Sequence, residues 1–444
     1  MARTAATFPA GVRLADYISL GVLTASFPLE AVQAVLARTG RESKRERELP
    51  AHVMVYYAIA LALYSDVSTR EVLRCLLEGS RWLGAAAVDD EPTGKTGISK
   101  ARTRLGASPL EALYREVVVP VAAEGTPGAW YRGWRVMSLD GSTLDVSDTE
   151  ANARAFGRPG SARGVNPTGA FPQVRVVGLL ETGTHVICGA ELGPCGTSEV
   201  RLAAQVVPHL TGEMLCLADR GLLGFDLWRT AAATGAALLW RAGVTFALPI
   251  RERFPDGSYR SELRWHSSCT SADRTPIPVR VLEYTLPGVP EAAASYRLVT
   301  NILESTRAPA EELATLYHER WEMETAFDEF KTHLRGARRV LRSKTPELVR
   351  QEAWGFLLAH FAIRALMHEA ALGALPRARD PDTMSFTHAL RVSRRTLPHL
   401  AAIPPSRPRA AGARPANDSS RAAPGAGELQ SRSSRAARRQ AKDE

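Results

Sequence analysis

Cysteine is scarce in this sequence, and no two cysteines have the C-x-x-C spacing of a metal or redox motif. The five cysteines lie far apart, at Cys75, Cys188, Cys195, Cys216 and Cys269. This distribution argues against a disulfide framework and against a zinc module, and it favours reduced thiols in a cytosolic protein. One loosely ligand-like group is more simply explained by unrelated residues on strands and turns: His185, Cys188 and Cys195.

Long hydrophobic runs are also absent. The longest run, residues 51–64, has 14 residues and includes a histidine, whereas a membrane-spanning helix needs about 20. The N-terminus carries no extended apolar stretch of the kind found in secretory signals. We therefore expect no membrane partner and a cytoplasmic location.

Three motifs of common enzymes are missing: the G-x-x-x-x-G-K-[ST] loop, the H-E-x-x-H helix and the G-x-S-x-G elbow. Their absence argues against P-loop ATP hydrolysis, zinc-dependent proteolysis of the H-E-x-x-H type and α/β-hydrolase chemistry. No internal repeat is evident, which argues against a solenoid or a propeller.

Positive charge is in excess, but only locally. The 444 residues carry 56 Lys and Arg against 47 Asp and Glu, a formal net charge of +9. Residues 331–350 hold seven basic residues and one Glu (+6), and residues 404–444 hold nine basic and four acidic residues (+5). The rest of the chain is therefore close to neutral, at −2. The charge permits nucleic acid as a partner and locates the basic surface.

The length and the 45% hydrophobic content indicate a globular protein of two or three domains. Residues 1–125 read as a helical N-terminal domain, because apolar residues recur there at helical spacing. Within it, a helix at 96–105 is joined at Gly106 to a helix that starts at Ser108. An ordinary helical pair explains this pattern better than a DNA-binding helix-turn-helix, which stays open.

Residues 126–400 read as an α/β domain. Predicted strands at 135–139, 143–146, 174–180, 185–188, 214–218 and 236–240, with helices at 198–210 and 222–234, indicate a mixed sheet with helices on its faces. A β-rich segment at about 243–304 precedes helices at 309–334 and 346–372. Residues 404–444 contain almost no large apolar residues, so we expect a disordered basic tail.

Two acidic residues are predicted to follow apolar strands directly. Asp140 precedes a glycine, and Asp219 precedes an Arg-Gly pair. A carboxylate at the end of a strand lies at the edge of the sheet, where ligands reach it. Taken alone, each is more simply a turn-capping aspartate, and nothing local separates either one from neighbouring carboxylates.

The predicted helix at 309–334 carries a sharper pattern. Tyr317, Arg320, Glu324 and Lys331 have offsets of 0, 3, 7 and 14, which at about 100° per residue place them on one face about 60° wide. An adjoining apolar stripe would pack the helix on the sheet. The same spacing also fits a solvated face on which Arg320 and Glu324 form an ordinary i,i+4 pair.

A carboxylate on this face would complete a set with Asp140 and Asp219. Three converging acidic groups are the hard ligands that Mg²⁺ prefers, and two such ions activate a water or a 3′-hydroxyl and stabilise the leaving oxygen. The basic segment follows immediately, and it would place five side chains along a phosphate backbone: Arg335, Arg338, Arg339, Arg342 and Lys344.

Together these residues resemble the DDE transposases of bacterial insertion sequences, in particular the family of insertion sequence four. The matching residues are Asp140 in Ser138-Leu-Asp-Gly-Ser-Thr, Asp219 in Leu217-Ala-Asp-Arg-Gly, and a Y-x2-R-x3-E-x6-K signature at Tyr317, Arg320, Glu324 and Lys331. The signature is specific, because it fixes four residue types over fifteen positions. The resemblance covers roughly residues 13–400.

The resemblance implies a ribonuclease H-like mixed sheet with flanking helices, a β-rich insertion before the helix of Glu324, and a helical N-terminal domain that binds DNA or regulates. It implies Asp140, Asp219 and Glu324 as the catalytic ligands of two Mg²⁺ ions, with Mn²⁺ able to substitute. Tyr317, Arg320 and Lys331 would contact DNA phosphates. The implied protein is bacterial and associated with the nucleoid.

The implied activity is cut-and-paste transposition. Metal-dependent cleavage frees the element at its inverted-repeat ends, and the 3′-hydroxyls are then joined to double-stranded target DNA by a homodimer. Two alternatives stay open. An inactive or truncated relic would only bind the ends, and a hydrolytic metal-dependent nuclease would cut without joining. The Pro/Arg/Ala/Ser tail departs from the family pattern, which leaves the role of the C-terminus open.

Overall fold

The structure is a computed structural model, and it describes residues 20–45, 49–65, 67–82, 94–160, 170–243, 246–285, 296–334, 336, 340–373 and 380–395. The predicted tail at 404–444 lies outside these residues, as do Arg335, Arg338 and Arg339. In the part of the chain that is described, no helix is long and apolar enough to cross a lipid bilayer.

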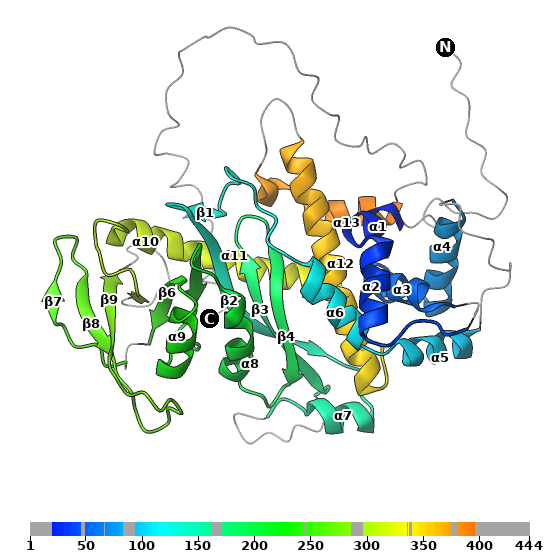
Figure 1. Cartoon of the computed structure of the whole chain (residues 1–444), viewed down its shortest axis with the longest axis horizontal. Helices are drawn as coiled ribbons and strands as arrows, with labels where there is room; N and C mark the ends of the chain where they lie inside the picture. The colour runs from blue at the N-terminus through cyan, green and yellow to red at the C-terminus, as the bar shows by residue number, and fades with distance from the viewer. Residues whose placement is uncertain are drawn as a thin grey trace, which may run out of the picture.

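Among the described residues, ten strands form one sheet, which runs from one end of the molecule to its middle (Figure 1). Their order is β4-β3-β2-β5-β6-β10-β9-β8-β7, and β1 pairs with β2. The strands are β1 Trp130–Tyr131, β2 Trp134–Asp145, β3 Gln173–Glu181, β4 Val186–Pro194, β5 Met214–Ala218, β6 Ala237–Ala242, β7 Glu252–Arg253, β8 Tyr259–Leu263, β9 Ile277–Tyr284 and β10 Tyr296–Thr300.

One half of the sheet has a ribonuclease H-like arrangement, which confirms the predicted fold class. β2, β5 and β6 are parallel neighbours, while β3 runs antiparallel between β2 and β4. The crossovers between the parallel strands are helical, because parallel neighbours need a long connection that returns across a face of the sheet. The helices α8 (Glu199–Val206) and α9 (Phe225–Ala232) serve this purpose and pack on one face.

The prediction of two strands at 135–139 and 143–146, joined by a turn at Asp140-Gly141, is wrong. A single twelve-residue strand, β2, runs through both segments. It pairs with β3 without interruption from Met137 to Asp145, and Asp140 lies opposite Gly178. The turn propensity of Asp-Gly is therefore overridden by pairing with β3. Asp140 lies inside a strand and does not end one.

The predicted β-rich insertion is present, and it is continuous with the half of the sheet that contains β2, β5 and β6. β10 pairs antiparallel with β6, from Arg297 opposite Ala242 to Thr300 opposite Leu239. β9, β8 and β7 then extend the same sheet outward. In Figure 1 these strands form one end of the molecule, and the N-terminal helices form the other.

The remaining helical elements are α1 Leu20–Ser26, α2 Leu29–Arg38, α3 Ala51–Leu63, α4 Thr69–Trp82, α5 Lys95–Leu105, α6 Ser108–Val117, α7 Glu150–Phe156, α10 Ala310–Tyr317, α11 Trp321–Asp328, α12 Pro346–Leu372 and α13 Phe386–Arg395. Short 3₁₀ turns occur at Val207–His209, His318–Arg320 and Pro381–Thr383. A π-helical segment, η5, spans Glu329–Leu334.

The N-terminal helices share one hydrophobic core with α12 and with one face of the sheet. α5 and α6 meet at Gly106, as predicted, where the backbone is left-handed with φ 70°. Arg102 of α5 is buried and donates to Gln351 of α12 at 2.8 Å. This burial favours the ordinary helical pair over a helix-turn-helix, because the basic side chain faces the core. The domain boundary at residues 125/126 stays a prediction.

The helix predicted at 309–334 is not one straight α-helix. It is divided into α10, the 3₁₀ turn His318–Arg320 (η4), α11 and the π-helical η5. Tyr317 therefore ends one helix, whereas Glu324 lies in the middle of the next. The angles of an ideal α-helix do not apply across this region, so the arrangement of the Y-R-E-K residues must be taken from their contacts.

Gly355 of α12 is expected to tolerate no side chain. A Cβ atom there would lie 2.6 Å from the carbonyl oxygen of Ala58 in α3. In most helix interiors Gly→Ala stabilises by about 1 kcal/mol. Here Gly355→Ala should instead lower the free energy of unfolding by about 1–3 kcal/mol, because two backbones must separate. Urea denaturation measures the change, and the control Gly196→Ala, where nothing lies within 4 Å, should stay close to wild type.

Candidate active site

Parallel pairing brings Asp140 and Asp219 to the same place in the sheet. The ladder between β2 and β5 ends at Leu139 opposite Ala218; Asp140 is the next residue of β2, and Asp219 directly follows β5. Side chains alternate along β2, so Asp140 points to the face opposite Leu139, which packs with α8 and α9. Asp140 therefore faces the side of the sheet on which α10 packs.

Arg320 links Asp140 to Glu324. Its Nη1 lies 3.3 Å from Asp140 Oδ2, and its Nη2 lies 3.4 Å from Glu324 Oε1. The Arg320 side chain is almost fully buried, at 8% exposure, whereas Glu324 keeps 43% of its side chain exposed. One guanidinium thus holds two of the three predicted carboxylates at the open side of the sheet.

The carboxylates of this site are hard to ionise together. Burial raises the pKa of Asp140, the charge of Asp219 raises it further, and Arg320 and Lys331 oppose the shift. Burial also raises the pKa of Glu324, and Asp140 and Asp219 contribute to that increase. Such mutual repulsion is typical of clustered acids at functional sites. A cation between them would relieve it.

Glu199 is a fourth acidic residue at this site that sequence reasoning missed. Burial raises its pKa, and the next largest cause is the charge of Asp140. Its carboxyl group occupies the space beside Gly141, where a Cβ atom would lie 2.7 Å from Glu199 Cδ. The sequence offers no signal for this role, because an acidic residue after the N-cap Ser198 is common in any helix.

Tyr317 is part of the protein interior. Its side chain is 5% exposed, and its hydroxyl donates to the carbonyl oxygen of Ala218 at 3.2 Å. Burial raises the pKa of Tyr317. The hydrogen bond ends at the residue just before Asp219, so the observed contact fixes the end of β5. This placement does not favour a direct phosphate contact.

The basic segment 331–350 divides into different environments. Lys331 is half-buried and close enough to Asp140 to influence its pKa. Arg342 donates to the carbonyl oxygens of Val67 at 2.7 Å and Leu61 at 2.9 Å, so it ties the N-terminal helices to the catalytic region. Two predicted DNA contacts after Lys331 lie within the described residues, Arg342 and Lys344. Of these, only Lys344 is exposed and open to a phosphate backbone.

The donor set suits a hard divalent cation. It consists of carboxylates, and Asp219 Oδ1 is buried and has no hydrogen-bond partner among the described residues. In the same part of the chain, no three His, Cys, Asp or Glu side chains converge closely enough to hold an ion as they stand. The Arg320 guanidinium lies between Asp140 and Glu324.

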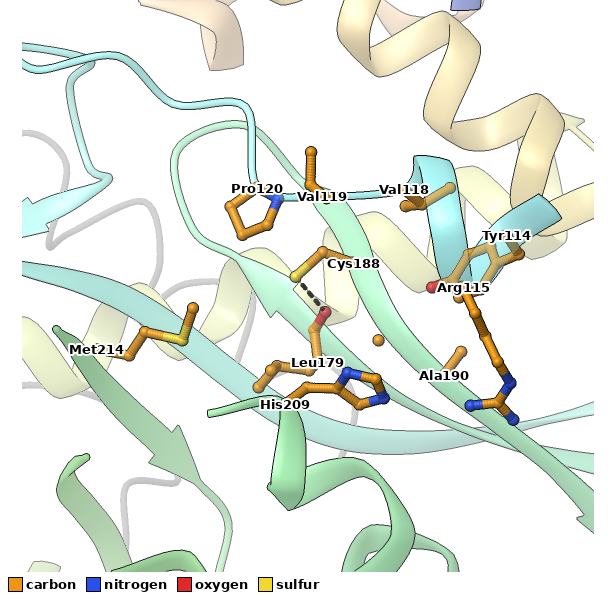
Figure 2. A pocket seen from close by; sticks show the side chains of 11 residues that line it. Tyr114, Arg115, Val118, Val119, Pro120, Leu179, Cys188, Ala190, His209 and Met214 are labelled. Atoms are coloured by element: carbon orange, nitrogen blue, oxygen red, sulfur yellow. Dashed lines mark hydrogen bonds between the residues drawn. The ribbon is translucent and has the colours of Figure 1, made fainter. Parts of the chain in front are cut away.

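A small cavity lies away from these residues (Figure 2). Its volume is about 150 Å³, and it is bordered by Tyr114, Pro120, Cys188, His209 and Met214, among others. The Cys188 thiol donates to the carbonyl oxygen of Leu179 at 3.4 Å, and burial raises its pKa. A thiol that stays protonated is a poor nucleophile. No predicted site residue borders this cavity.

Comparisons with known proteins identify the family. The family described as "Transposase DDE domain" matches residues 132–362, and the family "Insertion element 4 transposase N-terminal" matches residues 17–115. The chain is 27% identical over 386 residues to the Escherichia coli K12 transposase InsG for insertion sequence element IS4, covering 85% of this chain and 83% of InsG.

Among solved structures, the chain resembles a cryo-EM structure of the piggyBac transposase synaptic complex with hairpin DNA. The TM-score is 0.42 at 12% identity, with 88% of this chain and 83% of that chain covered. This similarity is too low to bear on function. The two family matches and the relationship to InsG are sufficient: the chain belongs to the IS4 family of DDE transposases, and it is a DNA transposase.

Proposed function

We propose that this transposase cuts DNA at the ends of its own element and joins the freed 3′-hydroxyls to a target. Asp140, Asp219 and Glu324 would be the catalytic residues and would hold divalent metal, Mg²⁺ or Mn²⁺. The observation that carries the proposal is the register of β2 and β5, which sets Asp140 beside Asp219, with Glu324 tied to Asp140 through Arg320. Metal bound there supplies Lewis-acid stabilisation of the attacking and leaving oxygens.

The protein's own residues would orient the DNA and balance the charge. Arg320 and Lys331 lie beside Asp140 and would bind the phosphate next to the cleaved bond. Tyr317 would act indirectly, because its hydroxyl holds the strand end that precedes Asp219. Lys344 would contact the phosphate backbone farther along. We omit Arg342 from the proposed contacts, since its guanidinium is committed to backbone carbonyls.

The proposed partners are the inverted-repeat ends and the target duplex, bound by a homodimer that pairs the two ends. The N-terminal helical region would contribute to end binding, and the protein would act in the bacterial cytoplasm at the nucleoid. Arg335, Arg338 and Arg339 remain proposed phosphate contacts on sequence grounds.

The test uses the purified full-length protein and DNA carrying the terminal repeats found beside its gene. With Mg²⁺ or Mn²⁺ we expect end cleavage followed by joining to a target plasmid, and with EDTA we expect binding alone. End binding without cleavage at any metal concentration would instead identify a relic. Cleavage without strand-transfer products would identify a hydrolytic nuclease.

A further inference from the structure

A buried cluster of charged side chains surrounds the π-helical segment that follows Glu324. Its centre is Glu329, the first residue of η5, whose side chain is 8% exposed. Arg364 of α12 donates to Glu329 through Nε at 2.8 Å and also through Nη2, so the ion pair is bidentate. An unpaired carboxylate in this position would be strongly unfavourable. The pair therefore fixes the start of η5 against α12.

Two histidines complete the surroundings of Glu329. His360 Nε2 lies 3.5 Å from Glu329 Oε2, and His185 Nδ1, which accepts a hydrogen bond from Arg364 Nη2, lies 3.6 Å from Glu329 Oε1. His185 also has its Nε2 at 3.2 Å from Asp382 Oδ1. The cluster thus joins four separate parts of the chain: the β3–β4 turn, η5, α12 and the 3₁₀ turn at Pro381–Thr383.

The backbone at His185 is held in an unfavourable conformation. Its φ is 59°, in the left-handed region that residues with a Cβ rarely adopt. Such residues persist only where the surrounding structure requires them, and they cluster at functional sites. Here the conformation turns the imidazole towards Glu329 and Asp382. The left-handed backbone of His185 is an observation independent of the Glu329–Arg364 ion pair, and it concerns the surroundings of the same Glu329 carboxylate.

The π-helical segment begins five residues after Glu324 and holds Lys331 as its third residue. Single π turns inside α-helices are uncommon and occur frequently at functional sites. Because η5 begins at Glu329, any shift of that residue changes the direction in which Lys331 leaves the helix. Glu324 is joined to Asp140 through Arg320, and the charge of Lys331 lowers the pKa of Asp140, so the position of this segment bears on the carboxylate cluster.

We propose that Glu329, clamped by Arg364, which is itself hydrogen-bonded to His185, is a positioning residue that sets Lys331 and Glu324 in register with Asp140 and Asp219. The inference rests on the proposed function, because it concerns the geometry of the same strand-cleavage site. Glu329 does not touch DNA or metal in this role. It acts by holding the π turn.

The test compares Glu329→Gln, which removes the charge at nearly constant volume, with Arg364→Lys, which keeps the charge but loses the bidentate pairing. Single-turnover end cleavage per folded molecule should fall by about 100-fold in Glu329→Gln and by less in Arg364→Lys, since small misplacements have effects of that size. The Mn²⁺ concentration for half-maximal cleavage should rise. Affinity for end DNA should change less than threefold.

The matched control is Asp256→Asn, between β7 and β8, which breaks another pair with a fully buried arginine, Arg280, at 2.6 Å. It should lower thermal stability and leave the cleavage rate per folded molecule unchanged.

Wild-type rates and metal response in Glu329→Gln would overturn the inference. Should that variant fail to fold, wild-type rates in Arg364→Lys overturn it instead. An inactive wild-type protein would contradict the proposed function but not the clamp of Glu329 by Arg364. In that case amide hydrogen exchange at residues 329–334 tests the clamp. Exchange in Arg364→Lys that is no faster than in the wild type would refute it.

Discussion

Asp219→Asn is expected to lower the single-turnover rate of end cleavage by about a thousandfold or more while leaving end binding intact. Asp219 follows β5 directly, and its buried Oδ1 has no hydrogen-bond partner among the described residues, so it is available as a ligand. Asparagine keeps the shape and removes the charge. Metal stabilisation of the transition state is worth several kcal/mol, and each 1.36 kcal/mol is a tenfold change in rate.

Asp226→Asn is the control for this loss. Asp226, seven residues later, is the second residue of α9, and it accepts hydrogen bonds from the backbone and hydroxyl of Thr270. The same substitution there should leave cleavage within about threefold of wild type. Isothermal titration with Mn²⁺ should show weaker metal binding in Asp219→Asn only. Undiminished cleavage by Asp219→Asn would remove Asp219 from the catalytic residues.

Gly183→Ala should lower the free energy of unfolding by about 3 kcal/mol, one of the largest losses for a single methyl group in this protein. Two costs combine at this position in the β3–β4 turn. The backbone is left-handed, with φ 76°, and a Cβ atom would lie 2.8 Å from the Ala129 nitrogen. The neighbouring atoms are backbone, including the Pro127 carbonyl oxygen, and cannot rotate away.

Gly257→Ala separates these two costs. Gly257 has a similar φ of 82°, but nothing lies within 4 Å of a Cβ placed there. It should therefore lose only about 1 kcal/mol, the cost of the left-handed backbone alone. Urea denaturation of both variants gives the difference, which measures the backbone contact. Equal losses at Gly183 and Gly257 would show that the turn relaxes freely.

The overall fold could be predicted because local pattern and tertiary structure mostly agree. The apolar strands before Asp219 and after Gly235 have strong β patterns, and pairing in the sheet reinforces them. The disagreement at Asp140-Gly141 is instructive. Two turn-forming residues lie inside a long strand because nine consecutive pairs with β3, Met137 to Asp145, outweigh their local preference.

The internal shape of the Glu324 region could not be predicted from periodicity. An apolar stripe at helical spacing is compatible with α, 3₁₀ and π turns over short stretches, and long-range contacts choose among them. Here the buried pair of Glu329 with Arg364, 35 residues away, holds the π segment. A single sequence gives no indication of which acidic residue meets which arginine.

In the candidate site, too, some residues could be predicted from the sequence, whereas the placement of others depends on long-range contacts. Asp140, Asp219 and Glu324 were chosen from motif and resemblance, and their catalytic roles stay predictions. Glu199 was missed because its position beside Gly141 depends on how α8 crosses the sheet. Arg342 was grouped with the phosphate contacts because it lies in a basic run, yet its contacts with Val67 and Leu61 are structural. Charge counts locate basic segments but not the direction of each side chain.

The ladder between β6 and β10 has a mechanical consequence. Four consecutive residue pairs, Arg297–Thr300, join the insertion to the strand next to β5, and the same β10 leads into α10. Within the described residues the two halves are joined by paired strands, in contrast to domains that move about a hinge. A load applied by DNA to β7, β8 or β9 would therefore reach the carboxylates through hydrogen-bonded strands. The insertion is therefore an extension of one continuous sheet and not a separately hinged domain.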